Sequence, residues 1–301
     1  MPKVTIGLPV YNGARSLARV IECLTSQTLS DIRIIVSDNG STDGTADICR
    51  KSATADERIS YYRQPEHLSL ADNFNFVLQQ ADDEFFMWAA ADDGWEPEYV
   101  ERLLQAIERD EEAAVSFSNV LVIDRQGTPV CELSLDWLNR PTSSARVRAY
   151  VATDPIMGAC NIMYGLFRRE VLLRGTRQFF WSEAGHFGAD FSFLLFVLLE
   201  GSVAYVPKTL FRKSAGGTSW HIRANMSAWE KFGHVKSMYL DAWRVLVEHD
   251  DLGAGQRIVS EIFLIYGFMK VLVARLLPAN RFNRVRLLSN QLARGGEPQD
   301  R

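Results

Sequence analysis

The chain has few cysteines, no large excess of charge of one sign and no long uninterrupted apolar run. Its 301 residues contain four cysteines, which lie far apart, form no C-x-x-C pair and have no histidine at metal-ligand spacing. This pattern favours reduced thiols in a cytoplasmic protein over a disulfide framework or a structural zinc site. The net charge of -4 argues against a nucleic-acid partner, which usually requires a basic domain.

The sequence pattern also lacks a membrane-spanning helix and a signal peptide. The nearest candidate span, Ile258 to Leu277, is interrupted by three charged residues, whereas a bilayer requires ~18–20 apolar residues. The N-terminus continues directly into a strand pattern, without the apolar core of a signal peptide. The remaining composition, 47% hydrophobic and 23% charged, is that of a globular protein that can bury a core.

Strand and helix patterns alternate along the first half of the chain. Apolar runs of strand length occur at 4–10, 32–37, 59–62 and 84–89, and helix-spaced apolar residues follow each of them. This alternation predicts an α/β fold with a mostly parallel, doubly wound, Rossmann-like sheet flanked by helices. Ligands bind such sheets at the carboxyl ends of the strands. Short acidic or amide-rich segments directly follow the first, second and fourth strands.

The second half has a less regular pattern. Short strands around a turn at Gly127 predict a β-ribbon insertion between 115 and 135. A strongly apolar helix is expected from 189 to 199, with Gly201 in the left-handed conformation that caps helices. Beyond 222 the pattern is helical, and the last residues resemble a disordered tail.

The ends of the first two strands contain groups suited to a nucleoside. Pro9, Tyr11 and Asn12 combine a backbone bend with an aromatic ring, although a plain turn is the simpler interpretation. Asp38 can accept a hydrogen bond from a uracil imide or a ribose hydroxyl, and Asn39 begins a tight turn with the following glycine. The hydroxyl and acidic residues from 41 to 43 are explained as caps of the next helix.

Two adjacent carboxylates, Asp92 and Asp93, follow the fourth strand. Such a pair is costly to bring together unless a cation or water screens it, so the pattern favours Mg²⁺ or Mn²⁺ bound together with diphosphate oxygens. A solvated turn is the alternative. Near the start of the apolar helix, Asp190 is either an N-cap or a general base.

The segment from 212 to 221 contains cations, hydroxyls and glycines. Arg212, Lys213 and Ser219 could donate hydrogen bonds to a diphosphate if this loop closes over it. A flexible surface loop explains the composition equally well. His221 could be a metal ligand, but a lone histidine is more often structural.

Taken in order, these segments resemble glycosyltransferase family 2, the inverting enzymes of the GT-A-type fold. The resemblance covers roughly residues 4 to 220. It rests on five strings: TIGLPVYNG, IIVSDNGSTDGT, ADNFNFVL, FFMWAAADDGWEPEYVERLL and GADFSFLLFVLLEGSVAYVPKTLFRKSAGGTS. It implies a catalytic domain at 1–221, with a donor-binding half up to about 110 and an acceptor half from 111, then a helical region at 222–293 and a tail at 294–301.

The resemblance also implies roles for individual residues. Pro9, Tyr11 and Asp38 would contact the nucleoside, the aspartates at 92 and 93 would form the D-x-D-type metal site, and Asp190 would be the catalytic base. The 212–219 loop would cover the diphosphate.

The chain also departs from the family pattern. Alanine at 189 replaces the glutamate of the E-D pair, Asp72 stands where a basic residue is common, and the histidine often found near Ser214 is absent. The shortened acidic motif, AADD, leaves Asp93 as the favoured direct ligand. Because no Q-x-x-R-W motif follows, a processive synthase is not expected.

The sequence and its resemblance therefore predict an inverting transferase that moves a sugar from a nucleoside diphosphate sugar to a glycan or lipid-linked acceptor. The resemblance favours UDP as the nucleoside diphosphate, because UDP-sugars are common donors in the family. A sugar nucleotidyltransferase and a non-catalytic nucleotide- or glycan-binding protein are the alternatives. The C-terminal helices combine an apolar face with arginines, so they would rest on the inner face of the membrane, pack on the core or form a homodimer.

Overall fold

The computed structural model describes residues 2–124, 126–152, 159–180, 189–215, 227–249, 253, 260–262, 264–265 and 267–268. Strands and helices alternate through the first half, as the apolar periodicity predicts, except that the two-residue strand β5 directly follows β4. The elements are β1 (Val4–Val10), α1 (Leu17–Thr25), β2 (Ile32–Asp38), α2 (Thr45–Ala55), β3 (Ile59–Arg63), α3 (Leu70–Gln79), β4 (Phe85–Trp88), β5 (Gly94–Trp95) and α4 (Tyr99–Arg109).

The second half mixes strands with longer helices. Its elements are β6 (Ala113–Ile123), β7 (Pro129–Leu133), the 3-10 helix η1 (Asp136–Leu138), α5 (Ser143–Ala152), the 3-10 helix η3 (Ala159–Tyr164), β8 (Leu166–Arg168), α6 (Arg169–Phe180), α7 (Ala189–Glu200), β9 (Ser202–Ser214) and α9 (Ala228–Glu248). The helical region expected from 222 to 293 includes α9, and most of the rest of that region lies outside the described residues.

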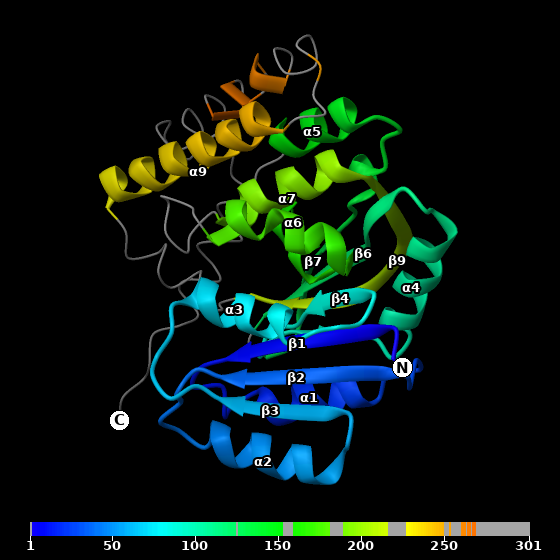
Figure 1. Ribbon diagram of the computed structural model, residues 1–301, viewed down its shortest axis with the longest axis vertical. Helices are drawn as coiled ribbons and strands as arrows, with labels where there is room; N and C mark the ends of the chain where they lie inside the picture. The colour runs from blue at the N-terminus through cyan, green and yellow to red at the C-terminus, as the bar shows by residue number, and fades with distance from the viewer. Residues whose placement is uncertain are drawn as a thin grey trace.

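The described strands form one nine-stranded sheet in the order β3-β2-β1-β4-β8-β6-β9-β5, with β7 paired to β6. Strands β1 to β4 are parallel, and they lie side by side in the lower half of Figure 1. Beyond β4 the sheet is mixed, because β8 runs antiparallel to both β4 and β6 while β9 runs parallel to β6. The first half therefore has the sheet that the sequence predicts, and the second half curls away from it.

The expected β-ribbon insertion at 115–135 is wrong in one respect. Gly127 does form the turn, with φ of 83°, and β6 and β7 are antiparallel. However, β6 is an 11-residue strand of the central sheet, paired along most of its length with β9. Its partner β9 is separated from it by some 80 residues of chain, so local pattern could not reveal the pairing.

The apolar helix α7 is buried on nearly all sides. Every residue from Phe191 to Leu199 is buried, because α5, α6 and α9 pack around this helix and β6 lies beneath it. A helix that is apolar all round is expected in such a position. The left-handed cap predicted at Gly201 is wrong, since this residue does not have a positive φ. Glycine is needed there because a Cβ would overlap the carbonyl oxygen of Glu112.

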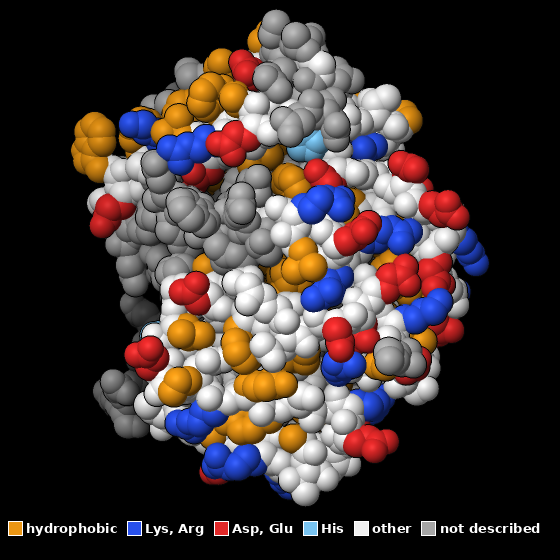
Figure 2. Space-filling model, in the orientation of Figure 1, with side chains coloured by type: hydrophobic (Ala, Val, Ile, Leu, Met, Phe, Trp, Pro, Cys, Tyr) orange, Lys and Arg blue, Asp and Glu red, His pale blue; other side chains and the backbone are white. Residues whose placement is uncertain are grey.

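Apolar side chains remain exposed on α9 and the short segment at 260–268. Trp229 is 83% exposed and Ile265 is 64% exposed. Figure 2 shows apolar side chains gathered over α9 at the top of this face, with charged side chains beside them, and a mixture of charged and apolar side chains over the lower part. A groove of about 380 Å³ lies between Tyr239, Trp243 and Leu264. None of the described helices is both long and apolar enough to cross a membrane.

Candidate active site

The loops that follow β1, β2 and β4 meet at one edge of the sheet. Strand register places Val10 beside Asp38 at the carboxyl ends of β1 and β2. The backbone of Ala89, just after β4, donates to Gly7 of β1. Farther along, the Ser16 hydroxyl donates to the carbonyl of Ala91 at 2.6 Å. The polar segments selected from the sequence are therefore neighbours in space, as the edge rule for parallel sheets requires.

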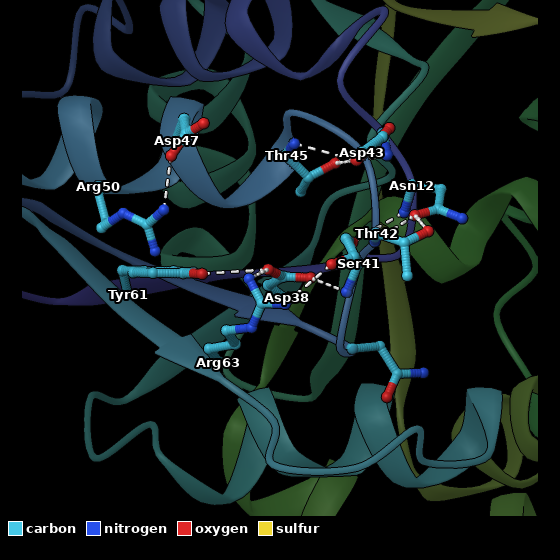
Figure 3. A network of polar contacts seen from close by, with 12 residues as sticks. Asn12, Asp38, Ser41, Thr42, Asp43, Thr45, Asp47, Arg50, Tyr61 and Arg63 are labelled. Carbon is cyan, nitrogen blue, oxygen red and sulfur yellow. Dashed lines mark hydrogen bonds and ion pairs between the residues drawn. The ribbon is translucent and has the colours of Figure 1, made fainter.

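Asp38 is a fully buried carboxylate at this edge. One oxygen accepts the backbone N–H of Ser41 at 2.8 Å, and the other accepts the hydroxyl of Tyr61 at 3.1 Å. The Arg63 guanidinium lies 3.7 Å from the second oxygen and donates to the Ser41 carbonyl at 2.9 Å. Figure 3 shows these groups converging from β2, its following loop and β3. The carboxylate is thus fixed before any ligand binds.

Asp43 caps the next helix, as the sequence interpretation allows, whereas Ser41 and Thr42 join two loops, which corrects that interpretation for them. Helix α2 begins at Thr45, whose N–H donates to Asp43 Oδ1 at 3.0 Å, but Ser41 and Thr42 do not cap it. Instead, the Asn12 N–H donates to Ser41 Oγ and the Thr42 N–H donates to Asn12 Oδ1, both at 2.9 Å (Figure 3). Asn12 has φ of 49°, a left-handed conformation that asparagine tolerates. Ser41 and Thr42 therefore join the loop after β2 to the loop after β1.

Tyr11 and Asn39 surround an aromatic side chain that sequence reasoning did not select. The ring of Tyr11, which is 50% exposed, lies 4.4 Å from the ring of His67. His67 Nδ1 lies 3.1 Å from the Asn39 carbonyl, and the Asn39 amide bonds the backbone of Leu68 in both directions. Pro9, in contrast, is buried within β1. Tyr11 and Asn12 are therefore the exposed members of the first motif.

Asp93 is fully buried and has a partner for each carboxylate oxygen. Lys213 Nζ lies 2.8 Å from Oδ2, and the Ser214 N–H donates to Oδ1 at 2.9 Å. Burial raises the pKa of Asp93 to about 6 although Lys213 and Ser214 oppose the shift. The sequence favoured Asp93 as the direct metal ligand, but both of its oxygens are already occupied by protein donors.

Asp92 has the opposite environment. It is half-buried, and within the described residues its carboxylate makes no hydrogen bond or ion pair. Its backbone carbonyl is held by Arg19, at 3.1 Å, and by the Ser214 hydroxyl. Of the two adjacent aspartates, Asp92 is thus the one with a carboxylate available to a ligand.

The two cations expected to contact a diphosphate already have carboxylate partners. Arg212 is half exposed and donates to Glu96 at 2.8 Å. The side chain of Lys213 is 23% exposed and lies 4.6 Å from the ring centroid of Tyr164. Burial lowers the pKa of Lys213, but attraction to Asp93 and to other acidic groups outweighs it and raises the pKa overall. Lys213 therefore stays charged.

Asp190 and the acidic pair are both near Tyr164. Asp190 stands in the first turn of α7 and is half-buried. Burial raises the pKa of Tyr164 to about 12, Lys213 opposes the shift, and the charges at 93, 92 and 190 add to it. Three carboxylates from two distant stretches of the chain thus act on one hydroxyl. No local pattern marked Tyr164, which lies in the short helix η3.

Comparison with known proteins decides the family. The family model for glycosyl transferase family 2 matches residues 5–172, more than half of the chain. The chain belongs to glycosyl transferase family 2. Glycosyltransferase GlyA of Streptococcus pneumoniae is 33% identical over 105 residues, which cover 35% of this chain and 15% of GlyA. The chain therefore spans well under two thirds of the length of this relative.

Solved structures show that this family 2 chain has the GT-A-type fold. S. aureus TarS, in complex with UDP-GlcNAc, superimposes with a TM-score of 0.64 at 15% identity, over 89% of this chain and 73% of TarS. The mannosyltransferase PcManGT from Pyrobaculum calidifontis, in complex with GDP-Man and Mn²⁺, gives 0.56 at 17% identity, over 99% of this chain and 81% of PcManGT. At these identities the likeness establishes the fold alone.

The donor set of this family 2 chain fits a divalent cation that is shared with a substrate. Within the described ranges no group of three or more His, Cys, Asp or Glu side chains could hold a metal by itself. Mg²⁺ and Mn²⁺ do not need such a cage at phosphate sites, where one or two carboxylates, water and phosphate oxygens complete the shell. The carboxylate of Asp92, which has no partner among the described residues, meets that requirement.

Two sequence predictions lie outside the described residues. Ser219 and His221 belong to the segment 216–226, so neither can be placed relative to the acidic groups.

The residues that line the apolar groove beside α9 belong to α9 and the 260–268 segment, and they include none of the acidic residues selected above.

Proposed function

We propose that this family 2 chain transfers a sugar, with inversion, from a nucleoside diphosphate sugar to an acceptor hydroxyl. The observation that carries the proposal is that Asp38 ends β2 and Asp92 follows β4, two strands that flank β1 and whose loops meet at one edge of the sheet. In addition, the charge of Asp190 acts on Tyr164 together with the charges of the acidic pair. The nucleotide sugars named with TarS and PcManGT support a donor of this class.

The nucleoside would bind at the carboxyl ends of β1 and β2. Asp38, held by Tyr61 and the Ser41 N–H, would accept a base N–H or a ribose hydroxyl. Tyr11 would supply an exposed aromatic face, with His67 beside it. Uracil offers an imide N–H to a carboxylate and carbonyl oxygens to a cation such as Arg63. Thymine offers the same groups, so we favour UDP because TarS, which has the same fold, is in complex with UDP-GlcNAc.

The diphosphate would lie over the loop at 90–93. A Mg²⁺ or Mn²⁺ ion bound by Asp92 would neutralise charge on the departing diphosphate. Asp93 is proposed to hold this loop and not to ligate the ion, because its oxygens are occupied. Mn²⁺ in the PcManGT complex supports a divalent cation of this kind.

Asp190 would act as the general base. Its carboxylate would accept the proton of the acceptor hydroxyl while the hydroxyl oxygen attacks the anomeric carbon and the diphosphate leaves with the bonding electrons. The single displacement inverts the anomeric centre. The N-terminus of α7 would stabilise the negative charge of Asp190.

We further propose a glycan or lipid-linked acceptor and a cytoplasmic site of action, at the inner face of the membrane. The exposed apolar side chains on α9 support contact with a lipid surface, and a homodimer through the same surface is the alternative. Co-sedimentation with liposomes and the mass measured by light scattering in detergent-free buffer separate the two.

The donor is tested by thermal shift with UDP, GDP and dTDP, each with Mn²⁺ and with EDTA, followed by release of nucleoside diphosphate from the matching sugar nucleotides. A transferase is expected to show Mn²⁺-dependent stabilisation and slow hydrolysis of one donor. Synthesis of a sugar nucleotide from a nucleoside triphosphate and a sugar 1-phosphate would instead identify a nucleotidyltransferase. Binding without turnover of any donor or acceptor would identify a non-catalytic protein.

A further inference from the structure

Three hydrogen bonds join the end of β9 to the loop that contains the two aspartates. Lys213 Nζ and the Ser214 N–H bind the two oxygens of Asp93, and the Ser214 hydroxyl binds the carbonyl of Asp92. We call Asp93, Lys213 and Ser214 the β9 clasp. More than 100 residues of chain separate its two halves.

Stability alone does not account for the charges in this clasp. Asp93 is fully buried and Lys213 is mostly buried, and an ion pair in such a position often contributes no more than well-packed apolar residues of the same volume. What a buried pair does impose is a single geometry, because either charge without the other is strongly unfavourable. The clasp therefore holds the loop at 90–93 in one position relative to β9.

The residue held in that position is Asp92. Its carbonyl is bound from one side by Ser214 of the clasp and from the other by Arg19 of α1, while its carboxylate has no partner within the described residues. A metal ligand needs support of this kind, since residues that orient a ligand typically change metal affinity 10–100-fold when removed.

We propose that the β9 clasp is a positioning device for the metal site: Asp93, Lys213 and Ser214 orient the Asp92 carboxylate without touching donor or metal. The proposal rests on the proposed function, because it assumes that Asp92 binds a cation together with a nucleoside diphosphate. It assigns Lys213 a role different from direct phosphate binding, and it assigns Asp93 a role different from metal ligation.

The test measures UDP affinity by calorimetry, with Mn²⁺ and separately with EDTA, on the full chain. The variants are Asp93→Asn, Lys213→Met, the double variant and Ser214→Ala. The control is Lys208→Met. Lys208 lies on the same strand, but its ammonium group pairs with Glu98 at the surface. We expect each single charge variant to weaken Mn²⁺-dependent affinity at least about tenfold, with affinity in EDTA unchanged. In the double variant, the fold-decrease in Mn²⁺-dependent UDP affinity should be smaller than the product of the fold-decreases in the two single variants, because no unpaired charge remains.

Two results would overturn the proposed role of the β9 clasp and leave the proposed function intact. If Lys213 binds phosphate directly, Lys213→Met will weaken and Asp93→Asn will strengthen UDP binding in EDTA. If the pair is only structural, the variants will melt at lower temperature but keep wild-type Mn²⁺-dependent affinity below that temperature. Should the charge variants fail to fold, Ser214→Ala keeps both charges, and an unchanged Mn²⁺-dependent affinity in it refutes the clasp. A wild-type chain that binds none of UDP, GDP and dTDP would remove the proposed function and the clasp together.

Discussion

The Tyr61 hydroxyl on β3 donates to Asp38 Oδ2 on the neighbouring strand β2, at 3.1 Å. Asp38 is fully buried, and burial together with this hydrogen bond raises the pKa of Tyr61 to about 12. The phenol therefore remains the donor at neutral pH, and the carboxylate is oriented in the absence of a nucleotide. Preorganisation of this kind reduces the entropy lost on binding.

Removing that donor should weaken both the fold and nucleotide binding. Tyr61→Phe leaves Oδ2 of the buried Asp38 carboxylate without its hydrogen-bond donor, with the Arg63 guanidinium 3.7 Å away, and such a loss typically costs about 1–3 kcal/mol of unfolding free energy. Urea unfolding measures this loss, and calorimetry with UDP measures the accompanying decrease in affinity. Tyr62→Phe is the matched control, because Tyr62 is 38% exposed and its hydroxyl makes no hydrogen bond within the described residues. Equal effects of the two substitutions would contradict the role of the Tyr61–Asp38 pair.

Asp190→Asn should affect catalysis and not donor binding. The amide cannot accept the acceptor proton as a base, so kcat should fall by about 10²–10⁴-fold. UDP affinity should remain that of the wild type, since Asp38 and Asp92 carry the proposed donor contacts. Single-turnover transfer and UDP calorimetry on the same preparation separate the two quantities. Near-normal turnover in this variant would rule out Asp190 as the base.

Asp92→Asn should remove the effect of the metal. The neutral amide is a much poorer ligand for a hard cation than the carboxylate. We therefore expect UDP affinity in Mn²⁺ to fall to the value that the wild type shows in EDTA, with no further decrease when EDTA is added to the variant. If Mn²⁺ still strengthens UDP binding by the wild-type factor, the ion is held elsewhere.

The buried Asp93 predicts a specific dependence of stability on pH. Its pKa in the folded chain rises from the ordinary 3.8 to about 6, so the folded state holds this proton more tightly than the unfolded state. The contribution of Asp93 to the free energy of unfolding should therefore decrease as pH rises from about 4 to about 6, and stay constant above that range.

Urea unfolding of wild type and Asp93→Asn across this range provides the measurement. The difference between the two free energies should change in the direction that lowers wild-type stability relative to the variant as pH rises. The opposite slope would mean that Lys213 lowers the pKa of Asp93 more than burial raises it.

Local periodicity was sufficient for the parallel half of the sheet. Apolar runs placed β1 to β4 and the buried face of α1, because residues close in sequence decide which side of a strand or helix can face a core. The edge rule then brought Asp38 and the two aspartates after β4 to the same side. The same rule, applied to β3, also selects Arg63 at the carboxyl end of that strand.

Pairing over long sequence distance accounts for what was missed. The hydroxyls at 41 and 42 read as helix caps because their partner Asn12 lies about 30 residues earlier. The local pattern indicates a helix cap at Gly201, because the carbonyl that crowds this residue belongs to Glu112, far away in the sequence. The sequence indicates a metal ligand at Asp93 and a phosphate contact at Lys213, because local sequence does not show that the two charges pair with each other.

The sequence by itself determined the family, the alternation of strands and helices, and the set of acidic residues that approach one edge of the sheet. Those properties follow from local apolar spacing and from short motifs whose order is preserved. Only the tertiary structure decided which charges neutralise each other and which carboxylate stays available. The reason is that a charge buried without a partner is strongly unfavourable, and in this chain the partner comes from a strand more than 100 residues away.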